Sequence, residues 1–311
     1  MRLPGLQLWA RRPTRTARAC TGARHDKAIE VPTKRLPLIE ESTTIDDCSA
    51  QVFSEKYGAS ERKAFVISVP KSGTYLLARV LHNLGIVDLE IHASEACLTD
   101  YRNRSNVEKV EQPRQFARMI PLEIAAQMIL PGQFMVGHIP FSQKNREVLR
   151  SFARFLCIRE LRQSLVSFMR FQYRRLKADP EHHPNKRFWI EEPTGPPMTR
   201  AFLSVYGAEH LSLAGEVFKW TSESGTVVCR FEDLLGDNGA ASRQQVAGNI
   251  AAALGFERQA GYFAVCDALG KETLTYSGSR SYLDGFWDAK VEAYFRELGG
   301  VERNRVLGYP D

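Results

Sequence analysis

Residues 64–85 read AFVISVPKSGTYLLARVLHNLG, which is a β-rich run, a turn of small residues and a run with helical spacing. Four of the five residues from Phe65 to Val69 are β-branched or aromatic and predict a buried strand. The helix expected over 74–84 carries its apolar residues on one face: Leu76, Leu77, Val80, Leu81 and Leu84. A strand that turns into a helix N-terminus suits phosphate-like anions, because backbone N–H groups and the positive end of the helix dipole face the ligand.

The turn at 70–74, Pro-Lys-Ser-Gly-Thr, adds a full positive charge through Lys71. This lysine precedes the glycine, so the ATP-binding pattern G-x-x-x-x-G-K-[ST] does not fit. The sequence therefore predicts an anion-binding turn with a different order of residues. A solvated lysine in an ordinary turn is the alternative interpretation.

A second strand and helix are expected over 154–178. Residues 154–158 predict a buried strand, and an apolar face with helical spacing follows it: Leu161, Leu165, Met169, Tyr173 and Leu176. Arg159 stands at the carboxyl end of the strand, and Ser167 lies eight positions later in the helix. A guanidinium can fork onto two phosphate oxygens and a hydroxyl can donate one more bond, so this pair is chemically suited to a phosphate.

Found in this order, each after a predicted strand, the two segments resemble the sulfotransferases that use 3′-phosphoadenosine 5′-phosphosulfate (PAPS). The resemblance extends from about residue 64 to residue 309 but is carried by a few short blocks. It implies a P-loop-NTPase-like sulfotransferase fold. It also implies an enzyme that moves a sulfuryl group from PAPS to a hydroxyl or amine of an acceptor, without a metal ion.

The same resemblance assigns roles to residues of this chain. Lys71 would contact the bridging oxygen and the 5′-phosphate, where it would stabilise the leaving group. The residues that follow it would bind the 5′-phosphosulfate: Ser72, Gly73, Thr74 and Tyr75. Arg159 and Ser167 would hold the 3′-phosphate.

His138 follows a predicted strand over 133–137, in the sequence Gly-His-Ile-Pro. This segment resembles the one that holds the catalytic histidine of the family. A neutral imidazole is suited to taking a proton from the attacking hydroxyl or amine near physiological pH. A structural histidine at a strand end is the alternative.

Two C-terminal blocks complete the resemblance. Phe231 lies in an aromatic-Glu-Asp block at a strand end, although a strand leading into a capped helix would give the same residues. Ser279 and Arg280 lie in a Ser-Gly-Ser-Arg-Ser segment that resembles the loop closing over the 3′-phosphate, and the composition is also common in loops. Tyr75 and Leu76 stand where many members have threonine and tryptophan, so Phe231 is the candidate adenine platform.

Charge and length place limits on the class of protein. The chain has 311 residues, 43% hydrophobic and 25% charged, which is ordinary for a globular protein. No apolar run reaches the roughly 18–20 residues of a membrane helix. The whole net charge of +6 lies in residues 1–27, so we expect no nucleic-acid-binding face on the folded part. Binding of nucleic acid by the tail stays an alternative.

The same residues suggest how the chain is organised. We expect residues 1–50 to be a basic tail and linker, and 51–311 to be a single domain. The arginine-rich tail resembles an organelle transit peptide, and a disordered arm is equally compatible with it. Six cysteines without C-x-x-C or metal spacing indicate a reducing compartment, and we expect a cytoplasmic protein.

Strands expected over 64–69, 133–137, 154–158 and 226–231 alternate with helices expected over 74–84, 143–152, 160–178 and 241–254. This alternation predicts an α/β protein with three α/β/α layers and a central parallel sheet. Residues 86–132 and 177–200 interrupt the pattern, and we assign both to the acceptor side of the site. A small-molecule acceptor is expected, and a peptide or glycan stays open, as does the oligomeric state.

Two other functions remain open at this stage. A P-loop-like nucleotide kinase or nucleotidase would need a Gly-Lys-Thr/Ser order and a metal-binding aspartate at a strand end, and the sequence shows neither. A non-catalytic nucleotide-binding module would keep the anion site but would have no use for His138 as a base.

Overall fold

The structure is a computed structural model, which describes residues 60–179, 187–269, 271 and 283–310, together with the backbone of the strands β1 (Leu38–Ile45) and β2 (Cys48–Glu55). β1 and β2 pair antiparallel in a two-stranded sheet, within a stretch that the sequence assigned largely to a linker. Ser279 and Arg280 lie outside the described residues, so their predicted contact with the donor stays a prediction.

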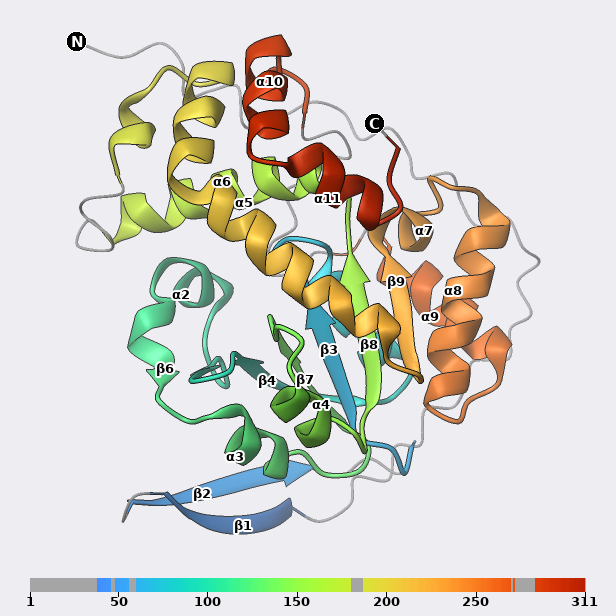
Figure 1. Cartoon of the computed structure of the whole chain (residues 1–311). Helices are drawn as coiled ribbons and strands as arrows, with labels where there is room; N and C mark the ends of the chain where they lie inside the picture. The colour runs from blue at the N-terminus through green and yellow to red at the C-terminus, as the bar shows by residue number, and fades with distance from the viewer. Residues whose placement is uncertain are drawn as a thin grey trace. The chain divides into compact units, whose positions relative to one another are not determined.

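Residues 31–311 form one compact unit, and its centre is a seven-stranded sheet. The strand order is β6-β5-β4-β7-β3-β8-β9 (Figure 1). Its strands are β3 (Ala64–Ser68), β4 (Val87–Ala93), β5 (Leu98–Asp100), β6 (Ala117–Arg118), β7 (Gln133–Gly137), β8 (Ala153–Ile158) and β9 (Thr226–Arg230). The four strands expected from the sequence are present, within one residue of their predicted bounds at each end.

The prediction of a parallel sheet is correct for five strands and wrong for one edge. β4, β7, β3, β8 and β9 are all parallel, whereas β5 pairs antiparallel with β4 and β6 antiparallel with β5. Only residues 94–97 connect β4 to β5, and the Ser94 hydroxyl donates to the carbonyl of Cys97 across this turn. So short a connection permits a hairpin but not the crossover that a parallel strand requires.

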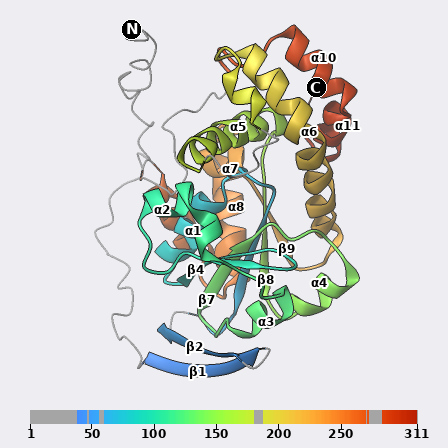
Figure 2. The ribbon, with the colours of Figure 1, turned by 90° about the vertical axis from the view of Figure 1, so that its left-hand side faces the viewer.

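Helices cover both faces of the sheet, which gives three α/β/α layers. One face packs on α1 (Thr74–Asn83), α8 (Ala240–Ala253) and α9 (Arg258–Ala268). The other packs on α3 (Leu122–Gln127), α4 (Gln143–Val148), α5 (Leu161–Ala178), α6 (Pro196–Phe218), α10 (Ala289–Glu297) and α11 (Gly300–Val306). In Figure 2, α1 lies on one side of the strands and α4 and α6 lie on the other.

Alternation along the strands explains the two apolar layers. In β3, Ala64 and Val66 belong to the cluster beneath α1, whereas Phe65 and Ile67 belong to the cluster beneath α6. Successive side chains of a strand point to opposite faces, so a fully apolar strand requires cover on both. Cys157 and Cys229 are buried within β8 and β9, as the sequence predicted.

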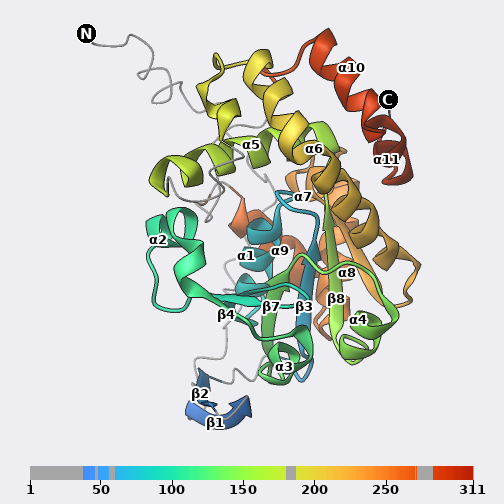
Figure 3. The same ribbon diagram turned by 60° about the vertical axis from the view of Figure 1, so that its left-hand side comes forward.

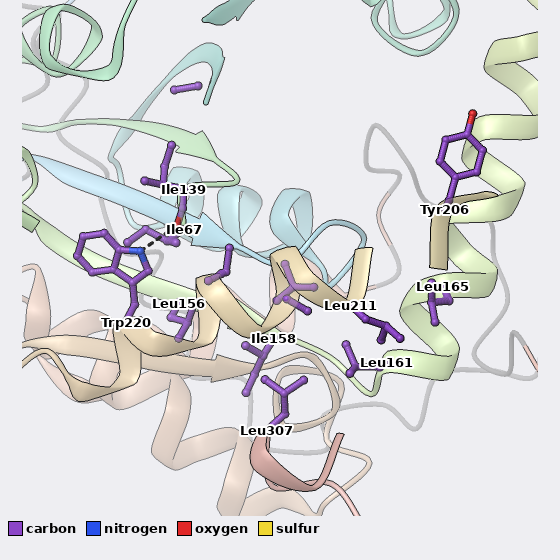
Figure 4. Packing of buried hydrophobic residues seen from close by; sticks show 14 of the residues in the cluster. Ile67, Ile139, Leu156, Ile158, Leu161, Leu165, Tyr206, Leu211, Trp220 and Leu307 are labelled. Atoms are coloured by element: carbon purple, nitrogen blue, oxygen red, sulfur yellow. Dashed lines mark hydrogen bonds between the residues drawn. The ribbon is translucent and has the colours of Figure 1, made fainter. Parts of the chain in front are cut away.

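The helix α6 was not expected from the sequence, which treated residues up to 200 as irregular. It begins at Pro196, a residue whose fixed φ suits the first turn. Beyond its end, the Trp220 indole donates a 2.9 Å hydrogen bond to the carbonyl of Ile139 (Figure 4). This bond holds the segment that follows β7, next to His138. No helix of the described residues is long and apolar enough to cross a membrane.

Candidate active site

A cavity of about 380 Å³ lies beyond the carboxyl ends of the parallel strands. We call it the strand-end cavity. Crevices at this position are the usual ligand sites of open α/β sheets. It is lined by residues that the sequence predicted for the site: Lys71, Gly73, Thr74, Tyr75, His138, Arg159, Ser167 and Phe231. The tertiary structure thus brings together the predicted motifs, although they lie in four separate segments of the chain.

Lys71 occupies a strained backbone position in the turn between β3 and α1. Its φ is 66°, a left-handed conformation that costs a non-glycine residue free energy and that is common at functional sites. Its ammonium lies 4.6 Å from the centroid of the Phe171 ring. Burial, followed by the charges of Arg159 and Arg174, lowers the pKa of Lys71 to about 7. Without a bound anion this amine is therefore only partly protonated at neutral pH.

Ser72 holds the turn in place and does not line the cavity. Its buried hydroxyl lies 2.6 Å from the carbonyl oxygen of Val69 and 2.7 Å from that of Cys157. A hydroxyl has one proton to donate, and both of these neighbours are acceptors. The predicted role of the Ser72 side chain as a donor to the ligand is therefore not supported by its position. The side chain instead ties the turn to β8.

A further hydrogen bond holds the turn at Pro70, immediately before Lys71. The Ser164 hydroxyl donates to the Pro70 carbonyl at 2.7 Å and lies 3.0 Å from Nε2 of His210. Because the Ser164 proton is used on Pro70, His210 must donate through Nε2–H. Burial lowers the pKa of His210 to about 3, so this imidazole is neutral. The turn is thus fixed from α5 and α6 as well as from β8.

Gly73 begins α1 with φ 102°, in the region that favours glycine. A Cβ at this position would also collide with the Phe231 ring. The first N–H groups of α1 have no intrahelical partners, and Gly73, Thr74 and Tyr75 line the cavity. No acidic residue occupies the first turn of α1, so nothing there opposes an anion.

Arg159 lies at the end of β8 and is buried, with 2% of its surface exposed. Its Nη2 donates to the Gln163 side-chain oxygen at 2.9 Å, and its guanidinium lies 4.1 Å from the Phe231 ring centroid. Both of these partners are neutral, so they orient the guanidinium without cancelling its charge. Ser167, two turns along α5, lines the same cavity. A guanidinium and a hydroxyl in one cavity wall are groups that can donate hydrogen bonds to a phosphate.

His138 follows β7 and is held in one tautomer. Its Nδ1 lies 2.8 Å from the backbone carbonyl oxygen of Ser68 and 3.0 Å from the Ser68 hydroxyl, which also accepts a 2.8 Å bond from Thr74. A carbonyl oxygen can only accept, so the proton is on Nδ1 and the lone pair is on Nε2. Burial lowers the pKa of His138 to about 4, the hydrogen bond to Ser68 opposes this shift, and Lys71 adds to it. The imidazole is therefore neutral and can accept a proton at Nε2.

A second histidine, His92 at the end of β4, packs edge-on against His138 with ring centroids 4.5 Å apart. Its Nδ1 lies 3.4 Å from the Tyr75 hydroxyl. Burial, His138 and Lys71 keep the pKa of His92 well below its usual range. The sequence interpretation missed this residue because it treated 86–132 as irregular. The alternating pattern of β4, VDLEIHA, was the signal that could have identified the strand.

The strand-end cavity carries charges of one sign. Five basic residues line it: Lys71, Lys109, Arg159, Arg175 and Lys271. Among its described lining residues there is no aspartate or glutamate. Lys109 is paired with Glu90 at 2.8 Å. The remaining excess of positive charge indicates a ligand with several negative charges.

Residues 86–132 and 177–200, the two segments that the sequence assigned to the acceptor side, differ in whether they line this cavity. Residues 86–132 contribute five residues to the wall of the strand-end cavity: His92, Thr99, Tyr101, Lys109 and Pro113. The described part of 177–200 contributes no lining residue. Instead, Trp189 is buried and packs against the Phe202 ring at 5.0 Å, because its indole fills the core beneath α6.

A larger cavity of about 730 Å³ lies between α1, β4 and the helix α2 (Asn106–Glu111). We call it the β4 cavity. It shares Tyr75, Tyr101 and Lys109 with the strand-end cavity but contains neither His138 nor Arg159. Burial raises the pKa of Asp88 in its wall to about 6. Size alone would select this cavity, but the predicted chemistry lies in the smaller one.

Comparison of the chain with protein families, curated proteins and solved structures finds no match. Any functional assignment therefore depends on the geometry of the strand-end cavity and on the motifs that line it.

Proposed function

We propose that this protein is a PAPS-dependent sulfotransferase, and that its α/β/α core is a P-loop-like sulfotransferase fold. The observation that carries the proposal is the convergence of Lys71, His138 and Arg159 on one cavity from three separate strand ends. Each was predicted for a different part of the reaction, and their convergence allows one ligand to contact all three groups.

The donor would lie along the carboxyl ends of β3, β8 and β9. Its 5′-phosphosulfate would face Lys71 and the first N–H groups of α1, and its 3′-phosphate would face Arg159 and Ser167. The excess of basic residues in the cavity matches the several negative charges of PAPS. Phe231 contacts both Gly73 and Arg159, so its ring lies between the two phosphate positions, where it could support the adenosine.

Transfer would occur by in-line attack of an acceptor hydroxyl or amine on the sulfur. A bond would form between the acceptor atom and sulfur, and the bond from sulfur to the bridging oxygen would break. The bridging oxygen would leave with its electron pair as part of 3′,5′-adenosine bisphosphate. The acceptor proton would pass to Nε2 of His138, which carries a lone pair because Nδ1–H is donated to Ser68.

Lys71 would stabilise the charge that develops on the bridging oxygen. The amine has a pKa of about 7 in the empty site. An anionic ligand favours the charged form of the amine and would raise its pKa. Lys71 would therefore take up a proton from the solvent as the donor binds. The charge would then be held in place before transfer begins, which is the condition for electrostatic stabilisation of a leaving group.

The deciding experiment compares thermal unfolding with 3′,5′-adenosine bisphosphate, with ADP and with buffer alone, followed by a transfer assay with ³⁵S-labelled PAPS. A ligand at about 100 times its Kd stabilises a protein by roughly 2.7 kcal/mol. We expect stabilisation by the bisphosphate and little by ADP, because Arg159 and Ser167 would bind the 3′-phosphate that ADP lacks.

Equal stabilisation by both nucleotides, or by ADP alone, would favour a nucleotide kinase or nucleotidase. Stabilisation by the bisphosphate without transfer to any acceptor would favour a non-catalytic binding module.

A further inference from the structure

Beyond its donor residues, the strand-end cavity carries a cation with no carboxylate partner. Arg175 lines the cavity from the last turn and a half of α5. Its Nε is buried and has no hydrogen-bond partner. No aspartate or glutamate of the described residues forms an ion pair with its guanidinium. Tyr101, Tyr206 and Asp179 oppose the lowering of its pKa by burial, and Asp179, one turn farther along, is the one carboxylate among them. A charged group that is partly buried without a counter-charge is unfavourable, and an anionic ligand would supply that counter-charge.

Gln172 lies one turn before Arg175, on the same face of α5, and adds a second unsatisfied group. Its side chain is buried, with 6% of its surface exposed, and its Oε1 has no hydrogen-bond partner. Residues three apart on a helix are neighbours. The Gln172 Oε1 can accept a hydrogen bond and the Arg175 guanidinium can donate, so the two form a polar patch in a cavity wall that is otherwise aromatic at Phe168 and Phe171.

Arg175 is separated from the residues that would bind the donor. Ser167 and Arg175 are eight residues apart on one helix, which corresponds to roughly 12 Å along its axis. The charges that act on Lys71 are those of Arg159 and Arg174, whereas Arg175 is acted on by Tyr101, Tyr206, Arg114 and Asp179. The two sets of basic groups thus occupy different parts of the cavity.

The strand order of the sheet also separates Arg175 from the residues that would bind the donor. Phe231 follows β9 at one edge of the sheet, whereas Thr99 of β5 pairs with His92 near the other edge. The far end of α5 lies over this second edge, where it packs against α2 (Figure 3). His92 and His138 lie on that side of β3, so an acceptor that reaches His138 would extend toward Arg175.

We infer that the acceptor carries an anionic group, a carboxylate or a sulfate, which the Arg175 guanidinium binds while the acceptor's hydroxyl or amine faces His138. This inference rests on the proposed function, because it assigns the other end of the same cavity. Arg114, exposed on the 3-10 helix Pro113–Phe116, acts on Arg175 as a second positive charge and adds to the local potential. A neutral or cationic acceptor would offer no counter-charge to the Arg175 guanidinium.

The test uses matched pairs of acids and their amides, which have nearly the same shape and differ in charge. The pairs are 4-hydroxyphenylacetate, glucuronate and N-acetyltyrosine, each with its primary amide. The full-length protein is first titrated calorimetrically with 3′,5′-adenosine bisphosphate, and each compound is then titrated into the saturated protein. A charge-assisted hydrogen bond adds about 1.5–3 kcal/mol, so at least one acid should bind about 10- to 100-fold more tightly than its amide.

An Arg175→Gln variant should reduce that preference to within about threefold and leave the affinity for the bisphosphate unchanged. Lys177→Gln removes an exposed charge from the same helix and is the matched control, which should keep the preference. The wild-type comparison needs no variant, so it decides the question even if Arg175→Gln fails to fold.

The outcomes distinguish the two proposals. If the bisphosphate does not bind, the proposed function is wrong and this inference fails with it. If the bisphosphate binds and no acid is preferred over its amide in any pair, whether because both bind equally or because neither binds, only the inference is overturned.

Discussion

The Nδ1 atom of His138 lies 2.8 Å from the backbone carbonyl oxygen of Ser68. Ser68 is the last residue of β3 and His138 follows β7, which is the neighbouring strand, so the parallel pairing of β3 and β7 sets this contact. The bond fixes the tautomer and leaves the Nε2 lone pair available. It also places the candidate base next to the turn that carries Lys71.

The first prediction concerns His138 as a base. His138→Ala should bind 3′,5′-adenosine bisphosphate with unchanged affinity and lose turnover by about 10²- to 10⁴-fold, as expected for a missing general base. Steady-state transfer and calorimetric binding measure the two effects separately. His82→Ala on α1 changes a histidine outside this cavity and is the control. Near-full activity of His138→Ala would remove this residue from the mechanism.

The second prediction concerns the pH dependence of donor binding. Lys71 has a pKa of about 7 in the free protein, and an anionic ligand raises it. Above pH 7 the protein must therefore take up a proton as it binds the bisphosphate, and the affinity should fall by up to tenfold per pH unit. The phosphates lose their last protons near pH 6 and contribute little to this change.

Lys71→Arg is the matched variant for that test, because an arginine stays protonated throughout this range. Its affinity should be independent of pH above 7, and calorimetry in buffers of different ionisation enthalpy should detect no proton uptake. Wild-type affinity that is equally flat between pH 7 and pH 9 would contradict the assignment of Lys71 to the anion.

The third prediction concerns the two glycines Gly73 and Gly215. Gly73→Ala should destabilise the protein by about 1–3 kcal/mol, because alanine is strained at φ 102° and its methyl group would displace the Phe231 ring. Gly215 lies within α6 with no neighbour close to its missing Cβ, so Gly215→Ala should stabilise by about 0.5–1 kcal/mol. Denaturant unfolding measures both, and similar effects of the two substitutions would contradict the close contact at Gly73.

The fourth prediction concerns Phe231. Phe231→Leu removes the ring that faces the Arg159 guanidinium at 4.1 Å, a contact of about 0.5–2 kcal/mol. Affinity for the bisphosphate should fall by about 2- to 30-fold, as measured by calorimetry. Phe263→Leu changes an exposed ring of α9 and should leave the affinity unchanged. If the two variants bind equally well, Phe231 does not support the donor site.

The sequence predicted the central layer well because its signals are local. Each predicted strand is a mainly apolar run of five or six residues, and the helices expected over 74–84 and 160–178 repeat their apolar residues at the helical period. Lys71, Arg159 and His138 stand directly at strand ends, so the parallel arrangement alone was sufficient to predict that they meet.

The edge of the sheet was less predictable, because β4, β5 and β6 are short or carry polar residues on one face. Asp88, Glu90 and His92 alternate with buried residues and resemble a polar loop unless the alternation is followed. The sequence interpretation therefore missed His92, which lies in β4.

The sequence alone determined an α/β protein with basic residues and a histidine at the ends of parallel strands, since a motif of strand, turn and helix depends on neighbours in the chain. Only the tertiary structure decided that the Ser72 hydroxyl binds the backbone, that His138 donates through Nδ1 and that Arg175 forms no ion pair with a carboxylate of the described residues. These properties depend on groups brought together from distant segments, and the spacing of residues along a chain carries no information about which polar groups satisfy one another.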